Sequence, residues 1–156
     1  MKKIDLGRRD LTDIPDNLWQ DANADANELY LHENLLSSLP MTIGGFRNLR
    51  VLDLGHNKLV NLHPALGELS KLEFLYLADN QIAELPSSLK NLKKLIYLNL
   101  SDNPLGVLPD WIGMLENLIE FRSYNAGLKT LPESIGNLNN LKELHLKNNS
   151  LTSLPD

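Results

Sequence analysis

The sequence predicts an α/β solenoid: stacked repeats form a right-handed, curved parallel sheet on the concave face and short helical or 3₁₀ turns on the convex face. Three observations lead to this prediction. Leucines recur with a 23-residue period at Leu49, Leu72, Leu95, Leu118 and Leu141, and a fixed period of about 20–29 residues is typical of such solenoids. Four of these leucines begin an L-x-x-L-x-L pattern, whose last two leucines point to one face of a strand. An asparagine follows at a fixed spacing in five of the seven repeats.

The period divides the chain into seven repeats of one expected domain, residues 1–156. The repeat boundaries are 1–25, 26–48, 49–71, 72–94, 95–117, 118–140 and 141–156, the last repeat being shorter than the others. A chain of 156 residues with 42% apolar and 22% charged residues has the size and composition of a globular domain rather than of a disordered segment.

Each repeat is expected to hold a short strand and a return segment. The inward strand positions are Ile4/Leu6, Leu29/Leu31, Leu52/Leu54, Leu75/Leu77, Leu98/Leu100, Phe121/Ser123 and Leu144/Leu146. Parallel strands need a long crossover, and apolar residues three apart in the return segments suit a short helical or 3₁₀ turn behind the sheet. These pairs are Ile43/Phe46, Leu66/Leu69, Leu89/Leu92, Ile112/Leu115 and Ile135/Leu138. The asparagine amide both donates and accepts, so we expect it to satisfy turn backbone in its own and the adjacent repeat.

Four positions depart from the pattern. Arg9 and Ala126 stand in asparagine positions, His63 stands where a proline is usual, and Ser123 stands in a leucine position. A serine in a leucine position lowers the local core volume and needs a hydrogen-bond partner. We therefore expect repeat six to be weaker or locally rearranged.

The form L-x-x-L-x-L-x-x-N-x-L-x-x-L-P-x-x-L-G-x-L resembles the leucine-rich-repeat family, in particular its 23-residue Ras-group intracellular subclass and the bacterial relatives of that subclass. The resemblance covers essentially the whole chain. It implies a curved solenoid with a strand-lined concave face and a role in binding other proteins, and it implies no catalytic residues.

Composition and motifs exclude several classes of function. A net charge of −5 disfavours sequence-independent binding to DNA or RNA, which needs a basic surface. The chain has no cysteine, which excludes disulfides, thiolate catalysis and a cysteine zinc site. Phosphate-cradling glycine loops, nucleophile elbows and metalloprotease motifs are absent from the sequence. We therefore expect neither enzymatic activity nor a cofactor.

The first ten residues, MKKIDLGRRD, are basic but are not followed by an apolar run. They match neither a secretory signal nor a membrane span. We expect a cytoplasmic protein, with an exported effector that carries an unrecognised signal as the alternative.

Function is expected in the outward strand positions, because the leucines are committed to packing. All four tyrosines and Phe74 fall in these columns. Since neighbouring strands lie about 4.8 Å apart, Phe74, Tyr76 and Tyr97 should touch or nearly touch. Exposed aromatics with a polar border are typical of a protein-binding hot spot. The candidate partner-binding residues are Tyr30, Val51, Asp53, Phe74, Tyr76, Asp79, Tyr97, Asn99, Asp102, Arg122 and Tyr124.

The charge of the same columns predicts the character of the partner. Repeats three to five hold Asp53, Asp79 and Asp102 there and no lysine or arginine, so we expect a basic, partly apolar protein or peptide. Alternatively, the aromatics stabilise the sheet through cross-strand contacts, and both roles can hold together.

Three further features have alternative interpretations. His32 and His56 could approach Glu33 and Asp53, but one histidine per strand converges too little for a metal ion, and no metal site is expected. Basic residues cluster on the loops that enter the strands and are expected to form a solvated rim, with a phosphate or acidic-partner patch as the alternative. They are Arg47, Arg50, Lys71, Lys93 and Lys94. Trp19 is expected in the core or cap of repeat one.

Trp111 is expected as a partly buried cover on the convex side.

No capping helix precedes Ile4 and no cap follows Leu154, so both edge strands would be open for pairing. Either the chain is cut from a longer one, or its ends meet other chains in end-to-end self-association.

The sequence therefore indicates a non-enzymatic protein–protein interaction module. The alternative is a recognition or targeting segment of a larger multidomain effector or signalling enzyme, such as a kinase, GTPase or ubiquitin ligase.

Overall fold

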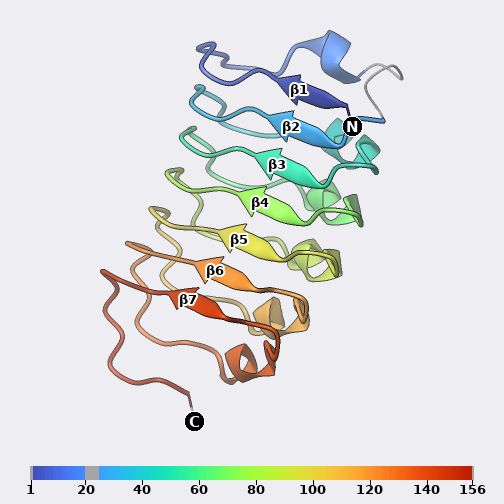
Figure 1. Ribbon diagram of the computed structural model, residues 1–156. Helices are drawn as coiled ribbons and strands as arrows, with labels where there is room; N and C mark the ends of the chain where they lie inside the picture. Colours follow the sequence, from blue (N-terminus) through green and yellow to red (C-terminus); the bar gives the residue numbers. More distant parts are fainter. Residues whose placement is uncertain (1, 20–24, 156) are drawn as a thin grey trace.

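The computed structural model describes residues 2–19 and 25–155, and in this part of the chain seven short strands form one parallel sheet. The strands are β1 (Lys3–Asp5), β2 (Glu28–Tyr30), β3 (Val51–Asp53), β4 (Phe74–Tyr76), β5 (Tyr97–Asn99), β6 (Glu120–Arg122) and β7 (Glu143–His145). Their spatial order is their chain order, and each strand pairs in parallel with the next (Figure 1). The predicted solenoid, with one strand per repeat, is confirmed.

Short 3₁₀ helices lie behind the sheet in Figure 1 and form the convex side. They are η1 (Asp16–Trp19), η3 (Met41–Gly45), η4 (Pro64–Glu68), η5 (Ser87–Asn91), η6 (Asp110–Met114) and η7 (Glu133–Asn137). A proline with extended backbone precedes four of them, which ends the preceding run and fixes the direction of entry. At η4 the departure from this pattern is compensated, because His63 Nδ1 accepts the backbone N–H of Ala65 at 3.1 Å while Pro64 moves into the helix.

The core lies between the sheet and the 3₁₀ helices. The inward leucines of the central repeats are fully buried, with Leu52, Leu75 and Leu77 all at 0% exposure. Burial weakens in repeat seven, where Leu144 of β7 is 40% exposed. Trp111 is half-buried and packs on the core, as predicted. The environment predicted for the Trp19 side chain lies outside what the structure describes.

Asparagine side chains join repeats two to five and repeat seven to the repeat before each of them. Asn57 Nδ2 donates to the carbonyl of Leu54 in its own repeat and to that of Leu31 in the previous one, and its Oδ1 accepts the N–H of Leu36. Asn34, Asn80, Asn103 and Asn149 make the corresponding bonds. The predicted double role of this asparagine is confirmed. Each net bond contributes about 1 kcal/mol to stability.

The residue before the asparagine position has left-handed backbone in every repeat. These residues are Arg8, Glu33, His56, Asp79, Asp102, Asn125 and Asn148, with φ between 47° and 59°. Aspartate and asparagine tolerate this conformation better than most side chains. The turn carries the chain out of the strand and sets these polar side chains along one edge of the concave face.

Repeat six keeps its strand, its register and its left-handed turn, and the rearrangement lies instead at its junction with repeat five; the predicted weakness of repeat six stays a prediction. Because Ala126 has no amide, the N–H of Leu105 bonds to the carbonyl of Asn103, two residues back, at 2.8 Å. The N–H of Gly106 donates to the carbonyl of Ala126 at 2.9 Å, and a φ of 70° lets Gly106 do so without strain. Backbone contacts therefore replace the missing side-chain bonds at this junction.

The expected partner for Ser123 is absent, which corrects that part of the prediction. Ser123 is fully buried, and its Oγ has no hydrogen-bond partner. The neighbouring N–H of Tyr124 donates instead to Ser101 Oγ of the previous repeat, at 3.0 Å. No helix in the described part of the chain is long and apolar enough to cross a membrane.

Candidate functional site

The strand register places the predicted site residues side by side on the concave face. Val51 pairs with Phe74 and Phe74 with Tyr97 in one column, while Tyr76 lies between Asp53 and Asn99 in the other. Nine of the eleven predicted residues are half-buried and two are exposed. The half-buried residues are Tyr30, Val51, Asp53, Phe74, Tyr76, Tyr97, Asn99, Arg122 and Tyr124, and the exposed ones are Asp79 and Asp102.

Three of the aromatic residues form a continuous cluster, called here the aromatic ridge: Phe74, Tyr76 and Tyr97. The ring centroids of Tyr76 and Tyr97 are 4.8 Å apart, and those of Phe74 and Tyr97 are 6.4 Å apart. The contact predicted from strand spacing is therefore present. Burial raises the pKa of both tyrosine hydroxyls, so both are neutral donors at physiological pH. The Arg122 guanidinium lies 5.8 Å from the Tyr97 ring centroid and closes one end of the ridge.

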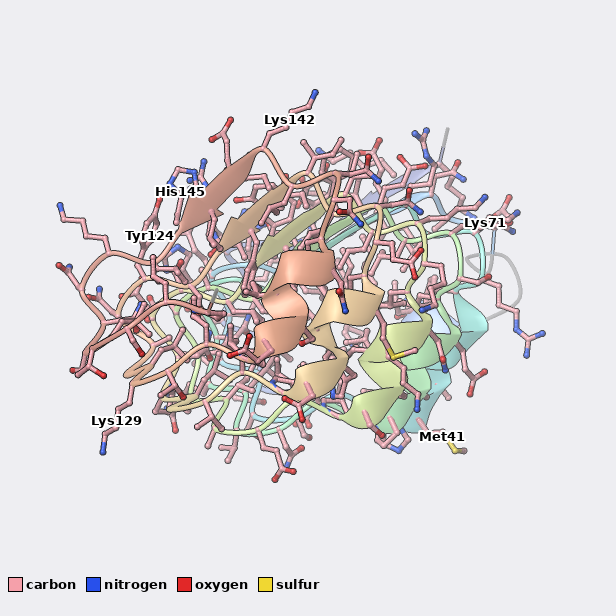
Figure 2. The ribbon with its side chains drawn as sticks, turned by 90° about the horizontal axis from the view of Figure 1, so that it is seen from below. Met41, Lys71, Tyr124, Lys129, Lys142 and His145 are labelled. Carbon is pink, nitrogen blue, oxygen red and sulfur yellow. The ribbon has the colours of Figure 1, made fainter. Side chains whose placement is uncertain are left out.

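The two other tyrosines lie apart from the ridge. Lys3 Nζ is 4.3 Å from the Tyr30 ring, and the Tyr30 hydroxyl donates to Glu28. Burial and the neighbouring Glu28 raise the pKa of Tyr30 to about 12. Tyr124 packs edge-on against His145 at 5.8 Å, and Figure 2 shows these two side chains together on the sheet side of the molecule. Met41 lies in the same view beside the 3₁₀ helices.

A hollow of about 310 Å³ opens beside the ridge on the concave face. It is called here the Asp53 hollow, and it is lined by Arg8, His32, Glu33, Asp53, Gly55, His56, Tyr76, Ala78 and Asn99. Asp53 Oδ1 accepts the N–H of Gly55 at 3.0 Å, and Oδ2 lies 3.5 Å from His32 Nδ1. That ring nitrogen is buried and makes no hydrogen bond, so the distance reflects proximity rather than a formed bond. Burial raises the pKa of the Asp53 carboxyl, although the Gly55 N–H opposes this effect.

Sequence reasoning did not find the hollow. The sequence did contain a signal for it. In one column of outward positions, the small residues Gly55 and Ala78 stand between the large residues His32 and Tyr124, and small residues between large ones leave a space. The predicted aspartates at its border already have polar partners. Asp79 Oδ2 lies 2.7 Å from His56 Nδ1, and Asp102 Oδ1 accepts from Asn125 at 2.6 Å.

His32 and His56 belong to no set of three candidate metal ligands among the described residues. Within the described ranges, the one set of three ligand atoms close enough to share an ion comes from Glu120, Glu143 and His145. The Arg122 guanidinium bonds directly to Glu120 and competes with a cation for that carboxylate. This set is a partly exposed ion-pair network, and the described residues give no second indication of a metal.

The basic residues at the strand-entry edge are exposed, as a solvated rim requires. Arg50 forms a two-pronged ion pair with Glu73, with N–O distances of 2.9 and 2.7 Å. Lys71 donates to Asn48, and Lys93 donates to the carbonyl of Met114. A shallow groove of about 450 Å³ lies along this edge and is lined by Glu73, Lys94, Ile96, Asn117, Ile119, Asn140 and Lys142.

A model of the leucine-rich repeat region matches residues 29–156. The chain belongs to the leucine-rich repeat family. The curvature of such solenoids creates extended concave binding surfaces, and the fold is a general scaffold for protein–protein interaction. A search of curated proteins finds no match to this leucine-rich repeat chain.

Solved structures of other leucine-rich repeat proteins share the fold. A leucine-rich repeat protein of Leptospira interrogans is 37% identical with a TM-score of 0.92, over 99% of this chain and 39% of that one. The leucine-rich repeat domain of the type III effector XopL is 27% identical with a TM-score of 0.84, over 97% of this chain and 53% of that one. This chain therefore spans 39% and 53% of the lengths of these two similar chains.

Proposed function

We propose that this chain is a non-enzymatic interaction module that binds a basic, partly apolar segment of a partner protein on its concave face. The aromatic ridge is the observation that supports the proposal. The Tyr97 ring packs against both the Phe74 and the Tyr76 rings. All three residues are half-buried, and the exposed residues Asp79 and Asp102 stand in the same repeats. Binding hot spots are enriched in tyrosine and typically lie at the centre of an interface, surrounded by polar residues.

Charge supports the basic character of the partner. The ridge is bordered in repeats three to five by Asp53, Asp79 and Asp102, and the nearest arginine, Arg122, is neutralised by Glu120. The hydrogen bond to Glu120 raises the pKa of Arg122, so the guanidinium is charged at physiological pH. A cationic segment laid across the ridge would meet the carboxylates of Asp53 and Asp102 at its border, and among the described residues neither has a lysine or arginine partner.

The proposal is tested by truncating the ridge. Tyr76→Ala and Tyr97→Ala should each weaken partner binding by about 2 kcal/mol, or about 30-fold, as is usual for hot-spot tyrosines. Proteins from the source cells are captured on immobilised wild type, on the double variant Tyr76→Ala/Tyr97→Ala and on Met41→Ala, and compared by quantitative mass spectrometry. Met41 is 68% exposed on the convex side and serves as the matched control.

A partner is assigned to the concave face if wild type and Met41→Ala retain it and the double variant loses it. Thermal unfolding of all three proteins verifies that the double variant is folded. Retention of the same partners by a folded double variant would refute the concave site.

A second candidate function is a recognition segment within a larger secreted effector. The observation that favours it is the likeness to the leucine-rich repeat domain of the type III effector XopL. An antibody against this chain would then detect a product substantially larger than 17.6 kDa in the source cells and in their culture medium. A single cytosolic product of this mass would favour a free-standing cytoplasmic module.

A further inference from the structure

We propose that the Asp53 hollow is a subsite for one arginine side chain of the partner. The inference rests on the proposed concave binding surface and adds the chemistry of one contact. The hollow combines a carboxylate, an aromatic wall and a floor of small residues, and each of these features matches one part of an arginine side chain.

The carboxylate of Asp53 is the first feature. The other carboxylate and the guanidinium that line the hollow are already paired, since Arg8 binds Glu33 at 2.8 Å. Among the described residues, no lysine or arginine nitrogen lies within 4.0 Å of Asp53. Its Oδ1 is occupied by the Gly55 N–H, and its Oδ2, which lies 3.5 Å from His32 Nδ1 without a hydrogen bond to it, is available to a charged donor. Charge-assisted hydrogen bonds of this kind are about twice as strong as neutral ones.

The shape of the hollow is the second feature. Gly55 contributes no side chain and Ala78 contributes one methyl group, so a space of about 310 Å³ remains between Tyr76 and His32. The aliphatic stem of an arginine can lie over Ala78, and its guanidinium can lie against the Tyr76 ring while donating to Asp53. A cation over an aromatic ring contributes about 0.5–2 kcal/mol.

These features favour arginine over lysine. The guanidinium is planar, stacks on aromatic rings, and is less strongly hydrated than an ammonium group, so it enters a half-buried site more readily. A neutral isostere of the same shape, citrulline, can fill the space but cannot form the ion pair. Comparison of the three side chains therefore separates charge from fit.

The chain itself supplies an isosteric test variant. In repeat five, Asn99 occupies the position of Asp53 and accepts the N–H of Ser101 at 3.1 Å, as Asp53 accepts that of Gly55. Asp53→Asn should therefore keep the turn and remove the charge alone. Asp5→Asn is the matched control, because Asp5 accepts the N–H of Gly7 in the same way but lies outside the hollow.

The experiment titrates acetyl-arginine methylamide, and the lysine and citrulline equivalents, into ¹⁵N-labelled protein in the millimolar range. Arginine should shift the amide signals of Gly55 and Ala78 saturably. Citrulline should bind roughly tenfold more weakly or worse, because it loses a charge-assisted bond. Asp53→Asn should weaken arginine binding to the same extent, and Asp5→Asn should leave it unchanged.

A second variant tests the shape independently of the charge. Ala78 is half-buried and lines the hollow, so Ala78→Leu fills the space and should abolish binding of the arginine derivative while Asp53 stays in place. It also decides the question if Asp53→Asn fails to fold. The subsite is refuted if arginine causes no saturable shifts at Gly55 and Ala78, if citrulline binds equally well, or if either variant binds arginine like wild type.

Failure of the subsite and failure of the proposed function give different results. If partner capture depends on Tyr76 and Tyr97 but arginine does not enter the hollow, the concave site stands and the subsite falls. If arginine enters the hollow but the folded ridge variants keep their partners, the ridge is not the docking surface, and the hollow is a cation site without that role.

Discussion

Asp53 carries an ionised carboxylate that burial disfavours. Desolvation raises its pKa above the ordinary value, and the Gly55 N–H and His32 offset this effect in part. For an acid, a raised pKa means that the folded protein holds the proton more tightly than the unfolded chain does. Below the unfolded pKa of about 3.9 the carboxyl is protonated in both states, and the protein loses no stability from it. The loss of stability develops as the pH rises from that value through the raised pKa of the folded state.

Asp53→Asn should accordingly make the protein more stable than wild type at pH 7. The advantage should shrink on acidification through the raised pKa, since wild-type Asp53 is then protonated and neutral. Urea unfolding of both proteins across this range measures the difference, with Asp5→Asn as the control. The pKa of Asp5 is lowered, chiefly by the Gly7 N–H, so that variant should lose stability at pH 7. If wild type became more stable relative to Asp53→Asn as the pH rises, the raised pKa of Asp53 would be contradicted.

Two buried serines in neighbouring repeats should respond to the same substitution with opposite signs. Ser101 Oγ accepts the N–H of Tyr124, whereas Ser123 Oγ is buried without a partner. Removing a used acceptor leaves a backbone donor unpaired, and removing an unused hydroxyl relieves a desolvation penalty. Ser101→Ala should cost about 1–2 kcal/mol, and Ser123→Ala should be neutral or stabilising by about 1 kcal/mol. Chemical denaturation measures both, and equal destabilisation would show that Ser123 has a partner in solution.

The convex elements stack closely because of glycine. A Cβ at Gly113 of η6 would overlap the backbone carbonyl of Ser134 in η7, and a Cβ at Gly67 of η4 would overlap that of Ser88 in η5. The close stacking of η4 on η5 and of η6 on η7 therefore requires a residue without a side chain at this position. In η7 the equivalent residue, Gly136, has no such neighbour within 4 Å.

This difference predicts that the same substitution, at the same position of the repeat, has different effects on stability in η6 and in η7. Gly113→Ala should lower the free energy of unfolding by about 2 kcal/mol, because the overlap involves backbone that must move. Gly136→Ala should be neutral or stabilising by about 0.5 kcal/mol, because alanine restricts the unfolded chain. Thermal unfolding of the two variants measures both changes in stability. Equal changes would show that η6 and η7 are not in close contact at Gly113.

At the scale of the whole molecule, repetition explains why so much of the fold could be predicted. A one-residue slip would turn Leu52 or Leu75 out of the core, so the strand register follows from the leucine spacing alone. The same register placed Phe74, Tyr76 and Tyr97 in contact. The Asp53 hollow could not be predicted in this way, because it depends on which neighbouring side chains leave space unfilled. Nor could the bond from Leu105 to Asn103, which follows from a local rearrangement around Ala126 and the backbone freedom of Gly106.

The exposed end of the sheet predicts self-association. Leu144 of β7 is 40% exposed, whereas Leu75 and Leu98 in the same position are 0% and 2% exposed. Leu154 of the same repeat is 69% exposed, and an edge strand offers unpaired backbone groups to another strand. We expect the isolated chain to associate through this end as its concentration rises.

Sedimentation velocity over a range of concentrations measures the association. Leu144→Lys should shift the protein toward monomer, because a charge on an edge strand opposes pairing. Val107→Lys is the matched control: Val107 is 66% exposed but lies in the segment between β5 and η6, away from β7. A wild type that sediments as a monomer at every concentration would refute association through β7. An effect of Val107→Lys equal to that of Leu144→Lys would place the contact on another surface, because only Leu144 belongs to the open strand.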